Sequence, residues 1–174
     1  KYFLIDTPEK IKELIELLLT QPSVSYDTET NGTDANLADL VGISFSIKVG
    51  EGYYIPVPED RTEAQAIVDE FRIILENANI AKIGQNIKYD MLVFKWYGVQ
   101  VKGKLFDTML AHYLIDPDTR HNMDVLSENY LGYTPISITT LIGAKGKGQG
   151  TMRDVPVENV VDYAAEDADV TLQL

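Results

Sequence analysis

Three strand-forming segments follow one another between residues 23 and 57 of this 174-residue chain. The segment "SVSYDTE" (23–29) precedes the alternating "DLVGISFSIKVG" (39–50), and a Gly-Glu-Gly turn leads into "GYYIPV" (52–57). Alternating apolar and polar residues joined by a short glycine turn are typical of a β-hairpin. The three segments therefore predict an antiparallel meander, and "YFLI" (2–5) predicts a further short strand.

The rest of the chain alternates between helical and extended patterns, which predicts a mixed α/β sheet with helices on its faces in a single domain, 1–174. The chain starts without Met and stops inside a helical pattern, so we expect a domain excised from a longer protein. Apolar spacing, N-caps and terminal glycines predict helices over 7–19, 62–77, 86–98, 107–115, 122–132 and 156–174, with strands at 80–84 and 99–103.

Charge is distributed unevenly along the chain. The net charge of −12 argues against a protein that simply coats nucleic acid with positive charge. Residues 81–153 nevertheless hold nine Lys and Arg against six acids, whereas 154–174 hold six acids and no base. A phosphate-bearing partner could meet the basic middle segment while acids elsewhere hold cations. Cysteine is absent, which excludes disulfides and thiolate metal sites.

Two carboxylates stand at the end of the strand in "VSYDTETNG". Asp27 and Glu29 are separated by one residue, so on a strand both side chains point to the same face. Two like charges side by side repel each other. Taken alone, an isolated Asp-x-Glu is more often a solvated strand end than half of a metal site.

Two further motifs carry polar side chains four residues apart on one helix face. In "GQNIKYD" these are Asn86 and Asp90, and in "YAAEDADVT" they are Tyr163 and Asp167. Simpler explanations exist for each motif, namely an Asn86 helix cap with an exposed Asp90, and a surface helix with solvated acids. The alanines around Asp167 would let that helix lie close against a sheet.

Together the three motifs supply four hard oxygen ligands, Asp27, Glu29, Asp90 and Asp167, from three separate elements. Mg²⁺ and Mn²⁺ prefer carboxylate and water oxygens. Two such ions, about 3.5–4 Å apart, can clamp a phosphodiester between an attacking water and a leaving oxygen. The combination favours a two-metal site over four unrelated surface acids.

The segments "YDTET", "GQNIKYD", "FDTMLAHYL", "RHNMDVLSENYL" and "YAAEDADVTLQL" resemble, in order, the 3′–5′ exonuclease (proofreading) domain of bacterial DNA polymerase I, a family A polymerase. More broadly they resemble the DEDD exonuclease superfamily, Tyr subclass. The resemblance implies a ribonuclease-H-like fold that removes nucleotides from DNA 3′ ends. It also implies single-stranded DNA 3′ ends and the polymerase domain of the same chain as partners, no membrane, and a cytoplasmic, nucleoid-associated location.

The same resemblance implies a role for each residue of the predicted centre. Asp27 would bridge two divalent ions, Mg²⁺ or Mn²⁺ with Zn²⁺ as an alternative. Glu29 would bind the first ion and orient water, Asp167 would complete that ion's ligand shell, and Asp90 would hold the second ion. Tyr163 would position the attacking water, because a phenol of pKa near 10 is a poor base at neutral pH.

Substrate contacts follow from the same likeness. Thr30 would lie by the terminal nucleotide, Gln85, Asn86 and Tyr89 would touch the sugar-phosphate, and Arg120 would meet a phosphate. A surface charge is the alternative explanation for Arg120.

The chain departs from the family pattern at two positions. Thr33 stands where that family has a leucine that wedges between the last bases, and Ile138 stands where it has a stacking aromatic residue. Both changes predict weaker DNA binding. The Gly/Lys loop at 143–150 lacks a phosphate-loop signature and is interpreted as a connection, while His112 and His121 are interpreted as structural residues too distant in sequence for an obvious ligand pair.

Two other functions compete with DNA proofreading. A ribonuclease D-like RNA 3′ trimmer would share the four carboxylates and the tyrosine, and a comparison of DNA with RNA strands would distinguish it. A catalytically silent structural domain of a polymerase is the second, although none of the four acids is missing here.

Overall fold

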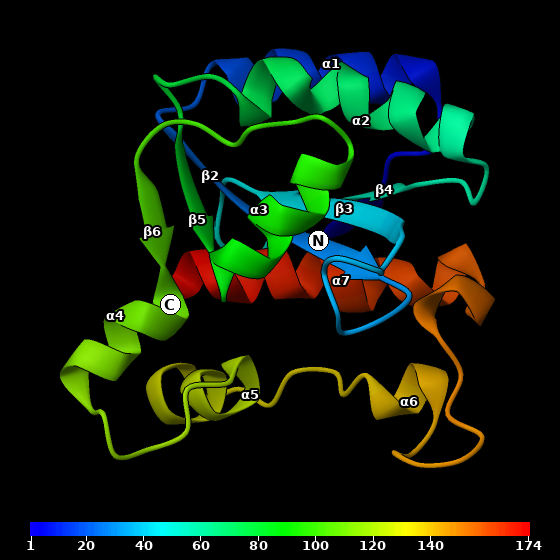
Figure 1. Ribbon diagram of the computed structural model, residues 1–174. Helices are drawn as coiled ribbons and strands as arrows, with labels where there is room; N and C mark the ends of the chain where they lie inside the picture. Colours follow the sequence, from blue (N-terminus) through cyan, green and yellow to red (C-terminus); the bar gives the residue numbers. More distant parts are fainter.

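A six-stranded mixed sheet forms the centre of the computed structural model, which describes residues 1–174 (Figure 1). The strand order is β1-β4-β3-β2-β5-β6. Strands β2, β3 and β4 form the predicted antiparallel meander, while β1, β5 and β6 each pair parallel to a neighbour. The strands are β1 (Tyr2–Leu4), β2 (Ser23–Thr30), β3 (Leu40–Ser46), β4 (Gly52–Pro56), β5 (Ala81–Gly84) and β6 (Leu105–Asp107).

Three helices, α1, α2 and α3, enclose the larger hydrophobic core against one face of the sheet. Thr7 caps α1 by accepting a hydrogen bond from the backbone N–H of Lys10 at 3.2 Å, and Pro8 follows at the first helical position, as predicted. Buried aromatic rings join the elements, since Phe45 of β3 stacks on Phe71 of α2. The helices are α1 (Pro8–Leu19), α2 (Arg61–Leu75) and α3 (Ile87–Trp96).

Helix α7 (Val157–Gln173) crosses the opposite face of the sheet (Figure 1). Its contact face is built from small residues, and Ala164, Ala165 and Ala168 are fully buried. The approach is so close that a Cβ on Gly52 of β4 would lie 2.5 Å from the Ala165 carbonyl oxygen. Ser25 of β2 also donates a hydrogen bond to the Ala168 carbonyl at 2.7 Å. The predicted close packing of this helix is confirmed.

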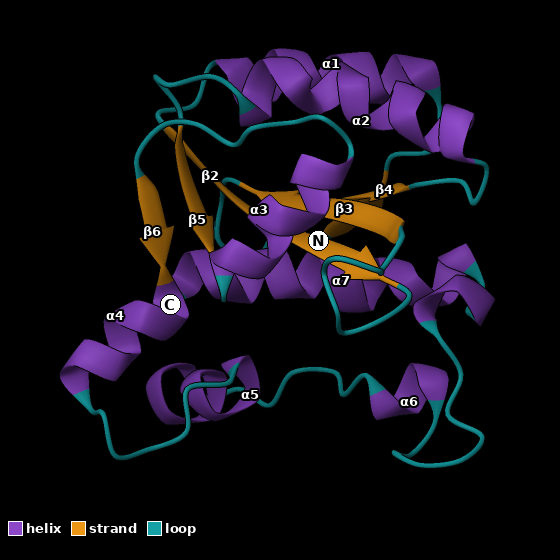
Figure 2. Cartoon of the chain, in the orientation of Figure 1, coloured by secondary structure: helices purple, strands orange, loops and turns teal.

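The segment between β6 and α7 covers the outer side of α7 (Figure 2). Glu166 of α7 accepts hydrogen bonds from the Tyr133 hydroxyl and, at 2.8 Å, from the Ile136 backbone N–H. As a result α7 is buried from both sides along most of its second half. The segment contains α4 (Thr108–Ile115), α5 (Met123–Leu126), the π-helical turn Ser127–Leu131, α6 (Thr139–Ile142) and the 3₁₀ turn Met152–Asp154.

Two predicted elements differ from the structure. The strand expected at 99–103 is absent, because Gly103 turns the chain with φ 95° and the strand forms later, as β6. The single helix expected over 122–132 begins as α5 and continues as a π-helical turn, ending at Gly132 in the left-handed conformation. None of the helices combines the length and apolar character that a membrane crossing requires.

The basic middle segment is less available to a phosphate than its composition predicts. Lys82 is fully buried, and its ammonium donates to the carbonyl oxygens of Asn77, Ile80 and Lys102 at 2.7–2.8 Å. Arg153 likewise donates to two backbone carbonyl oxygens. Two of the nine basic side chains therefore serve the fold itself.

Candidate active site

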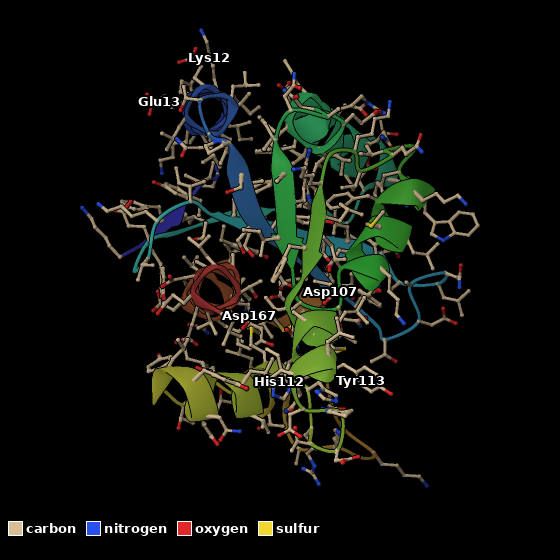
Figure 3. All side chains as sticks on the ribbon, turned by 90° about the vertical axis from the view of Figure 1, so that its left-hand side faces the viewer. Lys12, Glu13, Asp107, His112, Tyr113 and Asp167 are labelled. Atoms are coloured by element: carbon tan, nitrogen blue, oxygen red, sulfur yellow. The ribbon has the colours of Figure 1, made fainter.

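Strand β2 and helix α7 bring three of the predicted metal ligands together. Asp27 and Glu29 project from β2 on the face that α7 covers. Asp167 lies on α7 (Figure 3). One carboxylate oxygen from each of the three residues lies within 4.8 Å of the other two. The cluster forms because alternate side chains of β2 share one face and α7 packs closely against that face.

The Tyr54 ring from β4 packs over Gly42, the residue of β3 that pairs with Glu29. A Cβ at Gly42 would lie 2.2 Å from this ring, so a larger residue would displace Tyr54. Glu29 is only 5% exposed, and its Oε1 atom has no hydrogen-bond partner within the protein.

The site is electrostatically unfavourable for carboxylates on their own. Burial raises the pKa of the Asp27 carboxyl to about 7. Burial and the nearby charges of Asp27, Asp167 and Asp90 raise the pKa of Glu29 well above its ordinary value. For Asp90 and Asp167, burial and the charge of Asp27 raise the pKa in the same direction. Each carboxylate binds a proton more readily here because burial disfavours its charged form and, for Glu29, Asp90 and Asp167, neighbouring carboxylates add to this effect.

The donor set fits a hard divalent cation. All contributing atoms are carboxylate oxygens, which Mg²⁺ and Mn²⁺ prefer. The unpartnered Glu29 Oε1 is a buried acceptor that a cation would satisfy. A bound cation would also lower the raised pKa values by favouring the ionised carboxylates.

Asp90 lies beside the three-carboxylate cluster on α3. Its Oδ1 atom accepts a hydrogen bond from the Thr28 backbone N–H at 3.2 Å and another from the Thr28 hydroxyl. Thr28 is the residue between Asp27 and Glu29, so the two motifs are joined through the middle of Asp-x-Glu. The structure thus groups three predicted ligands and holds the fourth against the same strand.

Tyr163 lies one helical turn before Asp167 and faces the same cluster. Burial raises the pKa of its phenol, and the charges of Asp167, Glu29 and Asp27 raise it further. The hydroxyl therefore keeps its proton at neutral pH and can donate or accept a hydrogen bond. This agrees with a positioning role for Tyr163.

Two predicted substrate contacts lie together near the cluster. The hydroxyls of Thr30 and Tyr89 are 2.6 Å apart, and both donate to the Gly32 carbonyl oxygen, at 2.8 and 2.7 Å. They fix the turn that follows β2. Thr33, in the same loop, is exposed, and Ile138 is 37% exposed before α6.

The other three predicted substrate contacts, Gln85, Asn86 and Arg120, differ in their hydrogen-bond partners. Gln85 donates to the His121 carbonyl at 2.7 Å and also contacts the Thr108 hydroxyl, so both ends of its amide have protein partners. Asn86 stands at the N-cap position of α3, but its side chain makes no capping hydrogen bond. The cap interpretation of the Asn86 side chain is therefore wrong. Arg120 is exposed and forms no ion pair.

Two features of this region escape sequence reasoning. Asp107 caps α4 and also accepts hydrogen bonds from the N-terminus of α3. The side chains of His112 and His121 are in direct contact, with their Nδ1 atoms 2.6 Å apart. Their spacing of nine residues across a turn gave no signal of this contact.

A model of the 3′–5′ exonuclease family matches residues 2–174. DNA polymerase I of Pseudomonas aeruginosa is 39% identical over 161 residues, which cover 87% of this chain and 17% of that protein. DNA polymerase I of Borreliella burgdorferi is 36% identical over 177 residues, covering 100% of this chain and 19% of that protein. The chain spans less than a fifth of either relative.

Solved structures share the fold. NrnC of Brucella melitensis superimposes with a TM-score of 0.73 at 20% identity, covering 99% of this chain and 76% of that chain. The fold prediction, a ribonuclease-H-like mixed sheet flanked by helices, is confirmed by this similarity and by the strand order. Together with the match over residues 2–174, these likenesses show that the chain belongs to the 3′–5′ exonuclease family found in DNA polymerase I.

Proposed function

We propose that this chain removes nucleotides from DNA 3′ ends by metal-dependent hydrolysis, as the proofreading domain of a DNA polymerase I. The observation that carries the proposal is the cluster of Asp27, Glu29 and Asp167 with Tyr163 one turn away on the same helix. Family membership supports the reaction class, and the relatives' name supports the polymerase context. The polymerase domain and the cytoplasmic location belong to the proposal.

Each residue has a task that its position allows. Asp27 would contact both ions, Glu29 and Asp167 the first, and Asp90 the second. When bound, the divalent ions supply Lewis acidity at the attacking water and at the leaving 3′ oxygen. The neutral Tyr163 hydroxyl orients the water towards the phosphorus. Thr30 and Tyr89 lie together at the turn after β2, where Thr30 would contact the terminal nucleotide and Tyr89 the sugar-phosphate.

A direct assay tests the proposal and its main alternative. A 5′-labelled single-stranded DNA and an RNA of the same sequence are incubated with the protein and Mg²⁺ or Mn²⁺. We expect a ladder shortened from the 3′ end on DNA, faster than on RNA. Faster cleavage of RNA would favour a ribonuclease D-like trimmer. If the protein binds the strand but leaves both intact, the silent structural domain is favoured.

Removing the Tyr163 hydroxyl should separate water positioning from metal binding. We expect Tyr163→Phe to lower the cleavage rate by roughly 10- to 100-fold, the scale of a misplaced reactant, with metal affinity nearly unchanged. Tyr2→Phe is the matched control, because Tyr2 also donates to an α7 carboxylate, Asp169, away from the cluster. Rates and calorimetric metal titrations provide the measurements. A loss of metal affinity comparable to that of Asp27→Ala would contradict this division of tasks.

Restoring an apolar wedge should strengthen binding of the DNA end. Thr33 is exposed on the loop after β2, so a leucine there can bury apolar surface against the terminal bases. We expect Thr33→Leu to tighten single-strand binding by about fivefold, equivalent to burying one or two methylene groups. Fluorescence anisotropy in the Asp27→Ala background prevents cleavage during the measurement. Thr62→Leu, on an exposed face of α2, should have no effect; equal tightening by both variants would exclude a wedge at position 33.

A further inference from the structure

A single carboxylate joins the N-termini of two helices. Asp107 ends β6, where it pairs with Gly84 at the end of β5. Its Oδ1 atom accepts hydrogen bonds from the backbone N–H groups of Asn86 and Met109, each at 2.9 Å. Its Oδ2 atom accepts from the Ile87 N–H at 3.1 Å. Asp107 therefore caps α4 locally and α3 from a neighbouring strand (Figure 3).

Helix α3 depends on this distant cap because its own first residue cannot provide one. Asn86 adopts the left-handed conformation, with φ 57° and ψ 50°, and is the one non-glycine residue with positive φ. This conformation turns its side chain away from the amides that an ordinary cap would bind, and it is unfavourable for a residue with a Cβ. Hydrogen bonds from the backbone N–H groups of Asn86 and Ile87 to Asp107 hold the turn in this shape.

The neighbouring residue fastens the same turn. The Thr108 hydroxyl donates to the Gly84 carbonyl at 3.3 Å and contacts the Gln85 amide oxygen. Asp107 and Thr108, at the start of α4, therefore contact all three residues, 84 to 86, that lead into α3. Asp90 follows on the first turn of that helix, so a shift of the turn would move its carboxylate relative to Thr28 and Asp27.

We propose that Asp107 is a positioning residue that fixes the location of Asp90 in the metal centre and leaves the side-chain amide of Asn86 free for the substrate. The expected effect of Asp107 on cleavage rests on the proposed nuclease function, whereas its effect on the position of Asp90 does not. Its carboxylate also places negative charge at the N-termini of α3 and α4, where the helix dipoles favour it. Asp107 touches no reacting atom and acts through the backbone of α3.

Asp107→Asn tests this role selectively. The remaining oxygen can keep the bonds to Asn86 and Met109, while the new NH₂ group would face the Ile87 N–H and remove that one bond. We expect the cleavage rate to fall by roughly 10- to 100-fold, as for lost support of a metal ligand. Calorimetric titration should show one of two metal ions bound about tenfold more weakly and the other unchanged. In the metal-free protein, amide exchange of residues 86–90 should accelerate.

Asp60→Asn is the matched control, since Asp60 caps α2 by a single bond to the Glu63 N–H, which asparagine can retain. It should leave metal binding, cleavage and exchange at 86–90 unchanged. Wild-type metal binding and cleavage in Asp107→Asn, with only a lower Tm, would overturn the positioning role. If the wild-type protein itself cleaves no DNA, the proposed function fails, yet the titration and exchange data still decide whether Asp107 positions Asp90.

Discussion

Asp27→Ala is expected to lower the rate of 3′-end cleavage by at least about a thousandfold, because it removes the one carboxylate that would contact both ions. Asp27 lies within 4.8 Å of Glu29 and Asp167 through its carboxylate oxygens, and its charge raises the pKa of Asp90. Both ions should therefore bind more weakly in calorimetric titrations. Single-turnover cleavage of a 5′-labelled strand measures the rate.

The same variant should not be less stable without metal. In the metal-free wild type, Asp27 adds negative charge beside buried Glu29 and Asp167, so its loss relieves repulsion. We expect an equal or higher Tm for metal-free Asp27→Ala at pH 8. Asp39→Ala, which removes an exposed acid on the following loop, is the control and should retain full activity. Persistent cleavage by Asp27→Ala would exclude the proposed centre.

Removing divalent metal should abolish cleavage and make the stability of the protein depend strongly on pH. The folded-state pKa of Asp27 is about 7, above the unfolded value of about 3.9. Between these values the folded state holds more protons than the unfolded state, so the free energy of unfolding falls as pH rises. The raised pKa values of Glu29, Asp90 and Asp167 act in the same direction. The metal-free Tm should therefore decline from pH 5 to pH 8.

Mn²⁺ at about a hundred times its Kd should raise the Tm at pH 8 by roughly 5–10 °C, since binding favours the ionised folded state. At pH 5 the rise should be much smaller, because protons then compete for the same oxygens. Scanning calorimetry in chelator and in Mn²⁺, with ionic strength matched by NaCl, provides the comparison. An equal rise at both pH values would show that Mn²⁺ binds elsewhere.

Residues whose chemistry depends on local spacing could be predicted from sequence. Asp27 and Glu29 share a face because a strand alternates, and Tyr163 and Asp167 because a helix repeats. The buried alanines of α7 likewise follow from their small size. The family resemblance then connected the motifs, and the fold agrees with it.

Contacts between distant segments could not be predicted in this way. Asp107 can cap α3 only because β6 pairs with β5. The sequence does not reveal β6 as a strand, because Leu105 and Phe106 are both exposed and show no apolar alternation. Lys82 belongs to the basic segment that could meet a phosphate, but it is buried and its ammonium group donates to carbonyl oxygens from two loops. The contact of His112 with His121 depends on the same tertiary arrangement.

The position of α7 in the chain has a consequence for synthesis on the ribosome. This helix emerges after all six strands of the sheet, yet it covers Val41 and Tyr54 on the sheet and contributes both Tyr163 and Asp167. Until residue 167 has left the exit tunnel, the nascent chain can form only the larger of its two hydrophobic clusters and lacks one of the three clustered carboxylates. The smaller hydrophobic cluster and the carboxylate cluster are therefore completed at the same stage of synthesis.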